Sequence, residues 1–159
     1  MDRIMKLLAA EKRSYFESLN YLHSSRKTNL KMNYYFTKTI TGSFDNVIQK
    51  VTEALKTEGF GILTEIDIKS TLKKKLNVDF YNYKILGACN PPFAYKALQT
   101  EDKIGTMLPC NVIVQEKVLG QVEVSAVDPA ASMLSIENND LREIANEIRV
   151  KLQSVIEQL

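Results

Sequence analysis

The sequence of 159 residues contains no tryptophan, one histidine and two cysteines. Two cysteines are too few for the disulfide framework of a small secreted domain. No apolar run approaches the roughly 18 residues that a transmembrane helix needs. The apolar run near the N-terminus is short and is interrupted by Glu11, Lys12 and Arg13, which is not the pattern of a signal peptide. The absences together predict a reduced, cytoplasmic protein.

Several familiar catalytic and metal-binding patterns are also missing. The sequence has no Walker loop, GxGxxG, GxSxG or HExxH motif. The single histidine is His23, outside the main domain, so a Cys–His dyad within that domain is excluded. The paired CxxC or HxxxH spacings of zinc sites do not occur either. No particular cofactor is therefore predicted.

The charge is distributed unevenly along the chain, although its net value is only +2. Residues 1–31 contain seven Lys or Arg and three Asp or Glu, whereas the remainder contains 14 and 16. We interpret 1–31 as a helical extension and linker, and 32–159 as a single domain. The extension is expected to pack on protein, with a partner chain or an anionic surface as alternatives. Because the main domain is not basic, a nucleic-acid partner is not expected.

The main domain shows an alternation of strand and helix patterns. The expected order is β-α-β-α-β-α-β-β-α, with Ser43, Asp67, Asn90 and Asn139 as the helix caps. Leu119-Gly120 joins the last two strands as a hairpin. This order predicts an α+β, two-layer sandwich whose five-stranded, mostly antiparallel sheet is covered mainly on one face by helices. The other face must then be polar or covered by a second copy. Strands are expected at 33–41, 60–66, 80–88, 109–117 and 121–128, and the main helices at 43–58, 68–76, 91–98 and 139–159.

The segment 87–111 holds both cysteines, each followed by asparagine, as Cys89-Asn90 and Cys110-Asn111. Cys89 ends a predicted strand just before a helix, where the helix N-terminus would stabilise a thiolate. Three functional interpretations remain open: a reversible disulfide pair, a nucleophilic thiol, or a ligand or metal contact. The structural alternative is that both thiols are small buried hydrophobic groups.

Polar residues near these cysteines complete the set of site candidates. Asn90 and Asn111 are typical cap and turn residues. Glu65 and Glu123 stand within strands among apolar neighbours, and two carboxylates would meet there if both faced the uncovered side of the sheet. Asp128 is expected to cap the turn at Pro129. The candidate ligand-binding residues are Cys89, Asn90, Cys110, Asn111, Glu65, Glu123 and Asp128.

Four segments resemble the "domain of unknown function 302" family over about residues 34–159. They are FGILTEIDIKSTLKKKL, YKILGACNPPFAYKAL, IGTMLPCNVIV and VEVSAVDPAASM, in the order and spacing of the family's blocks. The resemblance implies a compact α+β domain that tends to form dimers, and it implies no established reaction. The recurrent residues of the family match here at Glu65, Cys89, Asn90, Pro91, Cys110, Asn111, Glu123 and Asp128.

From these observations we expect a dimeric, cytoplasmic module that binds or senses a small ligand or a metal near the two cysteines. The alternative is a thiol-based redox or sulfur-handling enzyme that uses Cys89 and Cys110. A third possibility is an interaction module whose extension binds a partner. Whether the protein catalyses a reaction is left open by the sequence.

Overall fold

The computed structural model describes residues 33–159. The predicted extension, residues 1–31, lies outside the described residues. Among the residues described, no helix is long and apolar enough to cross a membrane.

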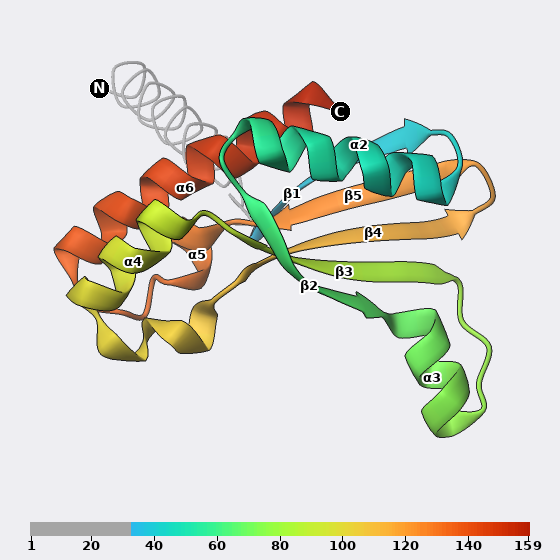
Figure 1. The fold of residues 1–159 in the computed structure, drawn as a ribbon, viewed down its shortest axis with the longest axis horizontal. Coiled ribbons are helices and arrows are strands. Elements are labelled where there is room, and N and C mark those ends of the chain that lie inside the picture. Colours follow the sequence, from blue (N-terminus) through green and yellow to red (C-terminus); the bar gives the residue numbers. More distant parts are fainter. Residues whose placement is uncertain (1–32) are drawn as a thin grey trace, which may run out of the picture. The chain divides into compact units, whose positions relative to one another are not determined.

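A five-stranded antiparallel sheet forms one layer of the domain, in the order β1-β5-β4-β3-β2 (Figure 1). Alternating apolar and polar residues produce these strands, because alternate side chains of a strand point to opposite faces of the sheet. The hairpin between β4 and β5 turns at Gly120, whose φ of 78° favours glycine. The strands are β1 (Tyr35–Thr41), β2 (Gly61–Asp67), β3 (Asn82–Cys89), β4 (Cys110–Val118) and β5 (Gln121–Val127).

Helices form the second layer on one face of the sheet, as the sequence predicted (Figure 1). Helix α2 (Phe44–Thr57) follows β1, and helix α6 (Asn139–Gln158) ends the domain. Between β3 and β4 the chain forms α4 (Pro91–Thr100) and the 3₁₀ helix η1 (Asp102–Met107), and α5 (Pro129–Ser132) follows β5. The fold is therefore α+β, with a two-layer arrangement.

The main core lies between the sheet and helices α2 and α6. Apolar residues of α2 at helical spacing are buried against alternate residues of the central strands. The apolar face of α6 packs against the same strands and completes the cluster. Its fully buried members include Val51, Leu55, Leu86, Val112, Val114, Val122, Val124, Leu152 and Val155.

A second, smaller core packs α4 and η1 against the N-terminal half of α6. Ile104 of η1 is completely buried there, with Ala97, Met133, Leu141 and Ala145. This cluster fixes the path of the chain between the two Cys-Asn pairs, and so it sets the position of both cysteines.

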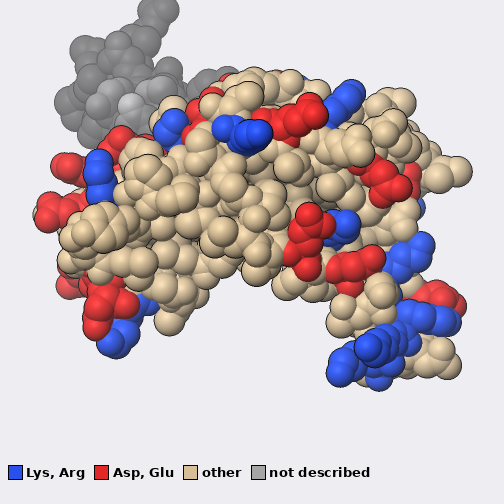
Figure 2. Space-filling model, viewed as in Figure 1, with Lys and Arg blue, Asp and Glu red and all other residues tan. Residues whose placement is uncertain are grey.

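Helix α3 (Ile68–Leu76) differs from the expectation, because none of its residues is buried. Its apolar residues Ile68, Leu72 and Leu76 lie at helical spacing but are only partly covered, and the Leu76 side chain is 66% exposed. Asp67 caps the helix as predicted. Helix α3 extends away from the rest of the domain, and its last turn carries lysines 73–75 (Figure 1, Figure 2).

Two predicted helix caps differ from the structure. The final helix is capped by Asn138, whose side chain accepts a hydrogen bond from the Leu141 amide, and Asn139 is already helical. Asn90 stands at the N-cap position of α4, but its side chain makes no capping bond. The Asn90 amide instead donates to the backbone carbonyl of Glu58 at 3.2 Å. The Asn90 side chain therefore bonds to a residue distant in sequence and not to the first turn of α4.

Candidate functional site

Consecutive residues of β4 divide the predicted site between the two faces of the sheet. Cys110 pairs with Ala88 and is buried on the side covered by the helices. Asn111, the next residue, pairs with Gly87 and faces the side that no described helix covers. We call this second side the open face.

On the helix side, Cys89, Asn90 and Cys110 border one small apolar cavity. The cavity has a volume of about 30 Å³, which is room for a water molecule but not for an organic ligand. Its other walls include apolar side chains of α4 and α6, among them Phe93, Ala97, Ile144 and Ala145. This surrounding suits a packed core more than a binding site.

Both thiols are harder to ionise than an ordinary cysteine. Burial raises the pKa of Cys89. Burial, and secondarily the neighbouring Cys89, raise the pKa of Cys110 to about 11. The predicted stabilisation of a Cys89 thiolate by the start of α4 is therefore outweighed by desolvation. Both cysteines are free, and they do not approach each other as a bonded pair.

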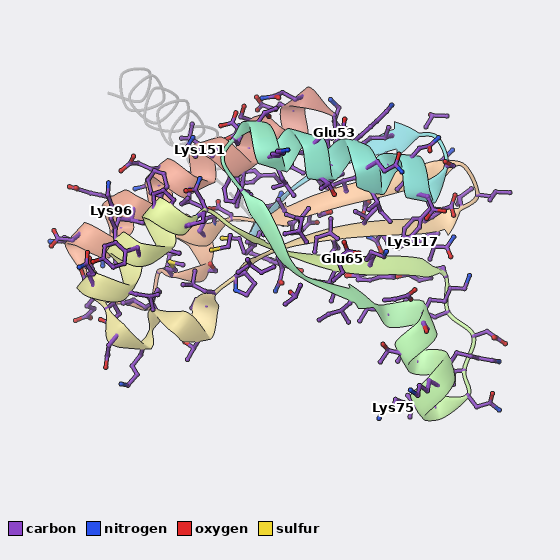
Figure 3. The ribbon with its side chains drawn as sticks, in the orientation of Figure 1. Glu53, Glu65, Lys75, Lys96, Lys117 and Lys151 are labelled. Atoms are coloured by element: carbon purple, nitrogen blue, oxygen red, sulfur yellow. The ribbon has the colours of Figure 1, made fainter. Side chains whose placement is uncertain are left out.

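The two strand-borne glutamates lie on opposite faces, so the condition under which their carboxylates would meet is not fulfilled. The register of β2 with β3 shifts between Ile62 and Thr64, which is a β-bulge. Beyond the bulge, Glu65 pairs with Leu86 and shares the helix side, where Lys84 binds it at 3.3 Å (Figure 3). Glu123 stands between buried Val122 and Val124 and faces the open side. The bulge also separates Ile62 from Thr64, which strict alternation would place together.

Asp128 has the capping role that the sequence suggested. Its carboxylate accepts hydrogen bonds from the amides of Ala130 and Ala131, at 3.0 and 3.3 Å. The other carboxylate oxygen lies 3.0 Å from Nε of Arg149 on α6. Asp128 is buried and lines none of the cavities described here, so its contacts are those of a structural residue.

The open face carries a groove of about 460 Å³, within the usual size range of small-molecule sites. Two of the predicted site residues, Asn111 and Glu123, line it. The rest of the lining comes from β1, β3, β4 and β5 and from Tyr34, next to β1, and it combines aromatic, aliphatic and polar residues. The further lining residues are Tyr34, Tyr35, Tyr83, Ile113, Gln115, Lys117, Ser125, Ala126 and Val127.

Side chains on the open face are connected by hydrogen bonds across the strands. The Gln115 side-chain amide donates to the carboxylate of Glu123, and the Tyr81 hydroxyl lies 3.3 Å from the Gln115 carbonyl oxygen. Gln115 and Ser125 are buried although no described helix covers them. The groove therefore has a fixed polar floor with aromatic rings at its sides.

Tyr83, Gln115 and Ser125 were not among the predicted site residues. The signal was present, because Gln121, Glu123 and Ser125 alternate with three buried apolar residues in QVEVSAV. Such alternation marks a strand with one uncovered face. The predicted site was centred on the cysteines, which border the small cavity on the helix side. The larger groove lies on the open face.

A metal centre lacks support in the described part of the chain. No group of three or more His, Cys, Asp or Glu side chains is placed there to hold an ion. The seven predicted residues are divided among the apolar cavity, the open-face groove and two structural ion pairs.

The fold, the Cys-Asn segments and the sheet agree with a family of α+β domains. The family model "Domain of unknown function DUF302" matches residues 36–159, and the chain belongs to this family. A crystal structure of an uncharacterized conserved DUF302 protein from Bacillus stearothermophilus is similar, with a TM-score of 0.73 and 27% sequence identity. The match covers 79% of this chain and 97% of that protein. No match was found among curated proteins.

Proposed function

We propose that this domain binds a small organic ligand in the open-face groove. The supporting observation is the groove itself, about 460 Å³ in volume and lined by Tyr34, Tyr35 and Tyr83 together with Glu123. Ligand sites commonly combine an apolar or aromatic wall with a few fixed polar groups. Of the predicted site residues, Asn111 and Glu123 would then contact the ligand.

The thiol-based alternative has less support. A nucleophilic or redox cysteine reacts as the thiolate, and the raised pKa values of Cys89 and Cys110 keep both thiols protonated near neutral pH. The cavity beside them is too small for an organic substrate. The two free thiols agree with a reducing compartment, which supports the proposal of a cytoplasmic location.

The proposal is tested by titrating the isotopically labelled full chain with a library of small polar metabolites. Amide chemical shifts in two-dimensional NMR spectra report which residues respond. We expect a bound metabolite to move the amides of Tyr83, Gln115 and Ser125 while those of Cys89 and Ala97 stay fixed. Saturable shifts confined to the segment around Cys89 would instead place the site in the cavity under α4.

A variant pair separates binding from folding. Tyr83→Leu removes an aromatic groove wall, and we expect it to weaken binding about tenfold or more. Tyr95→Leu, on the exposed surface of α4, is the matched control because Tyr95 is 64% exposed and lies outside the groove. Equal affinity in both variants would contradict a site in the groove.

We further propose that the chain forms a homodimer through the segment from β2 to Val78, just after the end of α3. Four large apolar side chains of this segment are exposed to solvent by 44–66%, namely Leu63, Ile66, Leu76 and Val78. β2 is an edge strand, and edge strands offer unpaired backbone groups to a second chain. None of the groove-lining residues belongs to this segment.

Light scattering coupled to size-exclusion chromatography tests the dimer. The double variant Leu76→Ser/Val78→Ser should shift the mass toward the monomer at a protein concentration where the natural chain is dimeric. Leu119→Ser, at the tip of the hairpin and 91% exposed, should leave the mass unchanged. A monomeric natural chain, or a double variant that stays dimeric, would refute this interface.

A further inference from the structure

We propose that the ligand of the open-face groove is an organic cation, a protonated amine attached to an apolar or aromatic body. This inference rests on the proposed function, because it assigns the chemical class of ligand for the same groove. It follows from which hydrogen-bond donors and acceptors the groove floor leaves unused.

The hydroxyl groups on the floor are oriented by a short chain of hydrogen bonds. The Thr37 hydroxyl donates to the backbone carbonyl of Val124 at 3.2 Å. Thr37 Oγ1 also lies 2.8 Å from Ser125 Oγ. Because a hydroxyl has one hydrogen, Ser125 must donate in that second bond. Ser125 therefore offers an acceptor, not a donor, to the groove.

The orientation of the Gln115 amide is settled by its partner. An ionised carboxylate only accepts hydrogen bonds, so the Gln115 nitrogen, not its oxygen, faces Glu123. The Gln115 oxygen then accepts from Tyr81. One hydrogen of the amide nitrogen is used on Glu123 Oε1, whereas no intramolecular hydrogen bond uses Glu123 Oε2 in the described part of the chain.

Charge and aromatic character point to the same class of ligand. Glu123 is the one carboxylate in the described lining, and Tyr34, Tyr35 and Tyr83 line the same groove. Aromatic faces and a carboxylate together attract an ammonium group. The other charged lining residue is Lys117, which is exposed in the bulge near the hairpin end of β4, where water screens its charge (Figure 3).

Tyr83 and Glu123 lie on either side of Gln115 in neighbouring strands of the open face. Desolvation first, and then Tyr81, Tyr34 and Glu123, raise the pKa of the Tyr83 phenol. The aromatic ring and the carboxylate therefore line the same stretch of the groove and can contact one ligand. The phenol stays neutral near neutral pH, so it adds no negative or positive charge of its own.

The test compares three probes of similar shape and different charge: benzylamine, benzyl alcohol and benzoate. Each is titrated into the full chain near neutral pH, and the shifts of the groove amides are fitted to a Kd. We expect benzylammonium to bind about tenfold more tightly than benzyl alcohol, and benzoate to bind least. In Glu123→Gln the preference for the ammonium over the alcohol should fall to about twofold or less. Glu65→Gln, which removes the same charge from the opposite side of the sheet, should keep the preference.

The possible outcomes separate this inference from the proposed function. If benzyl alcohol or benzoate binds in the groove as tightly as benzylammonium, the groove binds ligands but the cationic class is wrong. If Glu123→Gln keeps the full preference for benzylammonium, Glu123 is not the counter-ion and the inference is also wrong. If no probe shifts the groove amides and no metabolite of the library does so, both the inference and the proposed function fail.

Discussion

Cys110 and Asn111 are neighbours in β4, and their side chains lie on opposite faces of the sheet. Cys110 is 8% exposed beneath the helices, whereas Asn111 is exposed and lines the open-face groove. One residue of strand register therefore separates a core position from a position in the proposed ligand site. The two residues of the pair are expected to respond differently to substitution, with Cys110 affecting stability and Asn111 affecting binding.

The stability of the domain should depend on the Cys110 thiol at alkaline pH. Burial raises its pKa to about 11, and a cysteine of an unfolded chain titrates near about 8.5. Between these values the folded state holds the proton that the unfolded state has lost. The thiol's contribution is therefore complete below about pH 8.5 and is lost as the pH rises toward about 11.

Urea unfolding as a function of pH measures this effect. As the pH rises over that range, the free energy of unfolding of the natural chain should fall by up to about 3 kcal/mol more than that of Cys110→Ala. Val112→Ala is the matched control, since it truncates a buried residue of the same strand without removing a titrating group. Parallel stability curves for the natural chain and Cys110→Ala would show that the thiol titrates normally.

Gly87 of β3 is required by the close approach of two neighbouring side chains. A Cβ at this position would clash with Oγ1 of Thr64 and lie 2.7 Å from Cγ of Pro109. We expect Gly87→Ala to lower the free energy of unfolding by about 1–3 kcal/mol. Gly61→Ala is the control, because a Cβ there meets no atom within 4 Å, and it should change stability by less than about 0.5 kcal/mol.

A second substitution identifies the cause. Thr64→Ala removes one of the two obstructing groups, so the double variant Gly87→Ala/Thr64→Ala should recover part of the loss. Thermal and urea unfolding of the three variants provide the comparison. A double variant whose loss equals the sum of the two single losses would refute steric conflict with Thr64.

Much of the fold follows from local patterns in the sequence, and the deviations arise where tertiary partners decide. The residues Val47, Val51 and Leu55 recur at helical spacing in the sequence and are buried, because one side of α2 faces the sheet. The corresponding side of α3 is only partly covered, because α3 packs mainly beside β3 and β2 at the edge of the sheet. Periodicity indicates an amphipathic helix but does not identify what covers it.

The site was harder to predict than the fold. The β-bulge in β2 reverses the side on which Glu65 lies, and nothing in FGILTEI indicates where the extra residue falls. Asn90 binds the carbonyl of Glu58, which is distant in sequence, so its capping pattern was misleading. The two cysteines were predicted as site residues because thiols are reactive, but burial raises the pKa of Cys110 and so lowers its reactivity.

Glu58 connects the end of α2 to α6 and should contribute to stability above acidic pH. Its carboxylate accepts hydrogen bonds from Ser154 at 2.9 Å and from Lys151 at 3.4 Å. The Ser154 hydrogen bond, followed by contacts with Lys151 and Gln158 and opposed by desolvation, lowers the pKa of Glu58. The contribution is therefore present above the unfolded value of about 4.3 and lost as the pH falls through the folded value.

Glu58→Gln should destabilise the domain near neutral pH, and its difference from the natural chain should shrink toward about pH 3. Glu53→Gln on the same helix is the control, since Glu53 is exposed and makes no side-chain hydrogen bond among the described residues (Figure 3). Urea unfolding at both pH values supplies the measurement. A Glu58→Gln difference that is constant with pH would mean that the charge of Glu58 does not act.

The two residues of the half-buried ion pair between Asp128 and Arg149 should respond unequally to substitution. The Asp128 side chain is 5% exposed, whereas that of Arg149 is 46% exposed. Asp128→Asn can still accept from the Ala130 amide, and it leaves Arg149 with access to water. We expect it to cost about 1 kcal/mol. Arg149→Met leaves a buried carboxylate without its cation, and we expect a cost of about 2–4 kcal/mol.

A double-mutant cycle completes this test. Asp128→Asn/Arg149→Met buries neither an unpaired carboxylate nor a charged partner, so it should be more stable than Arg149→Met alone. Asp128→Ala, which removes the cap and the ion pair together, should cost more than Asp128→Asn. If Arg149→Met costs no more than Asp128→Asn, the amides of Ala130 and Ala131 alone stabilise the carboxylate, and Arg149 contributes little.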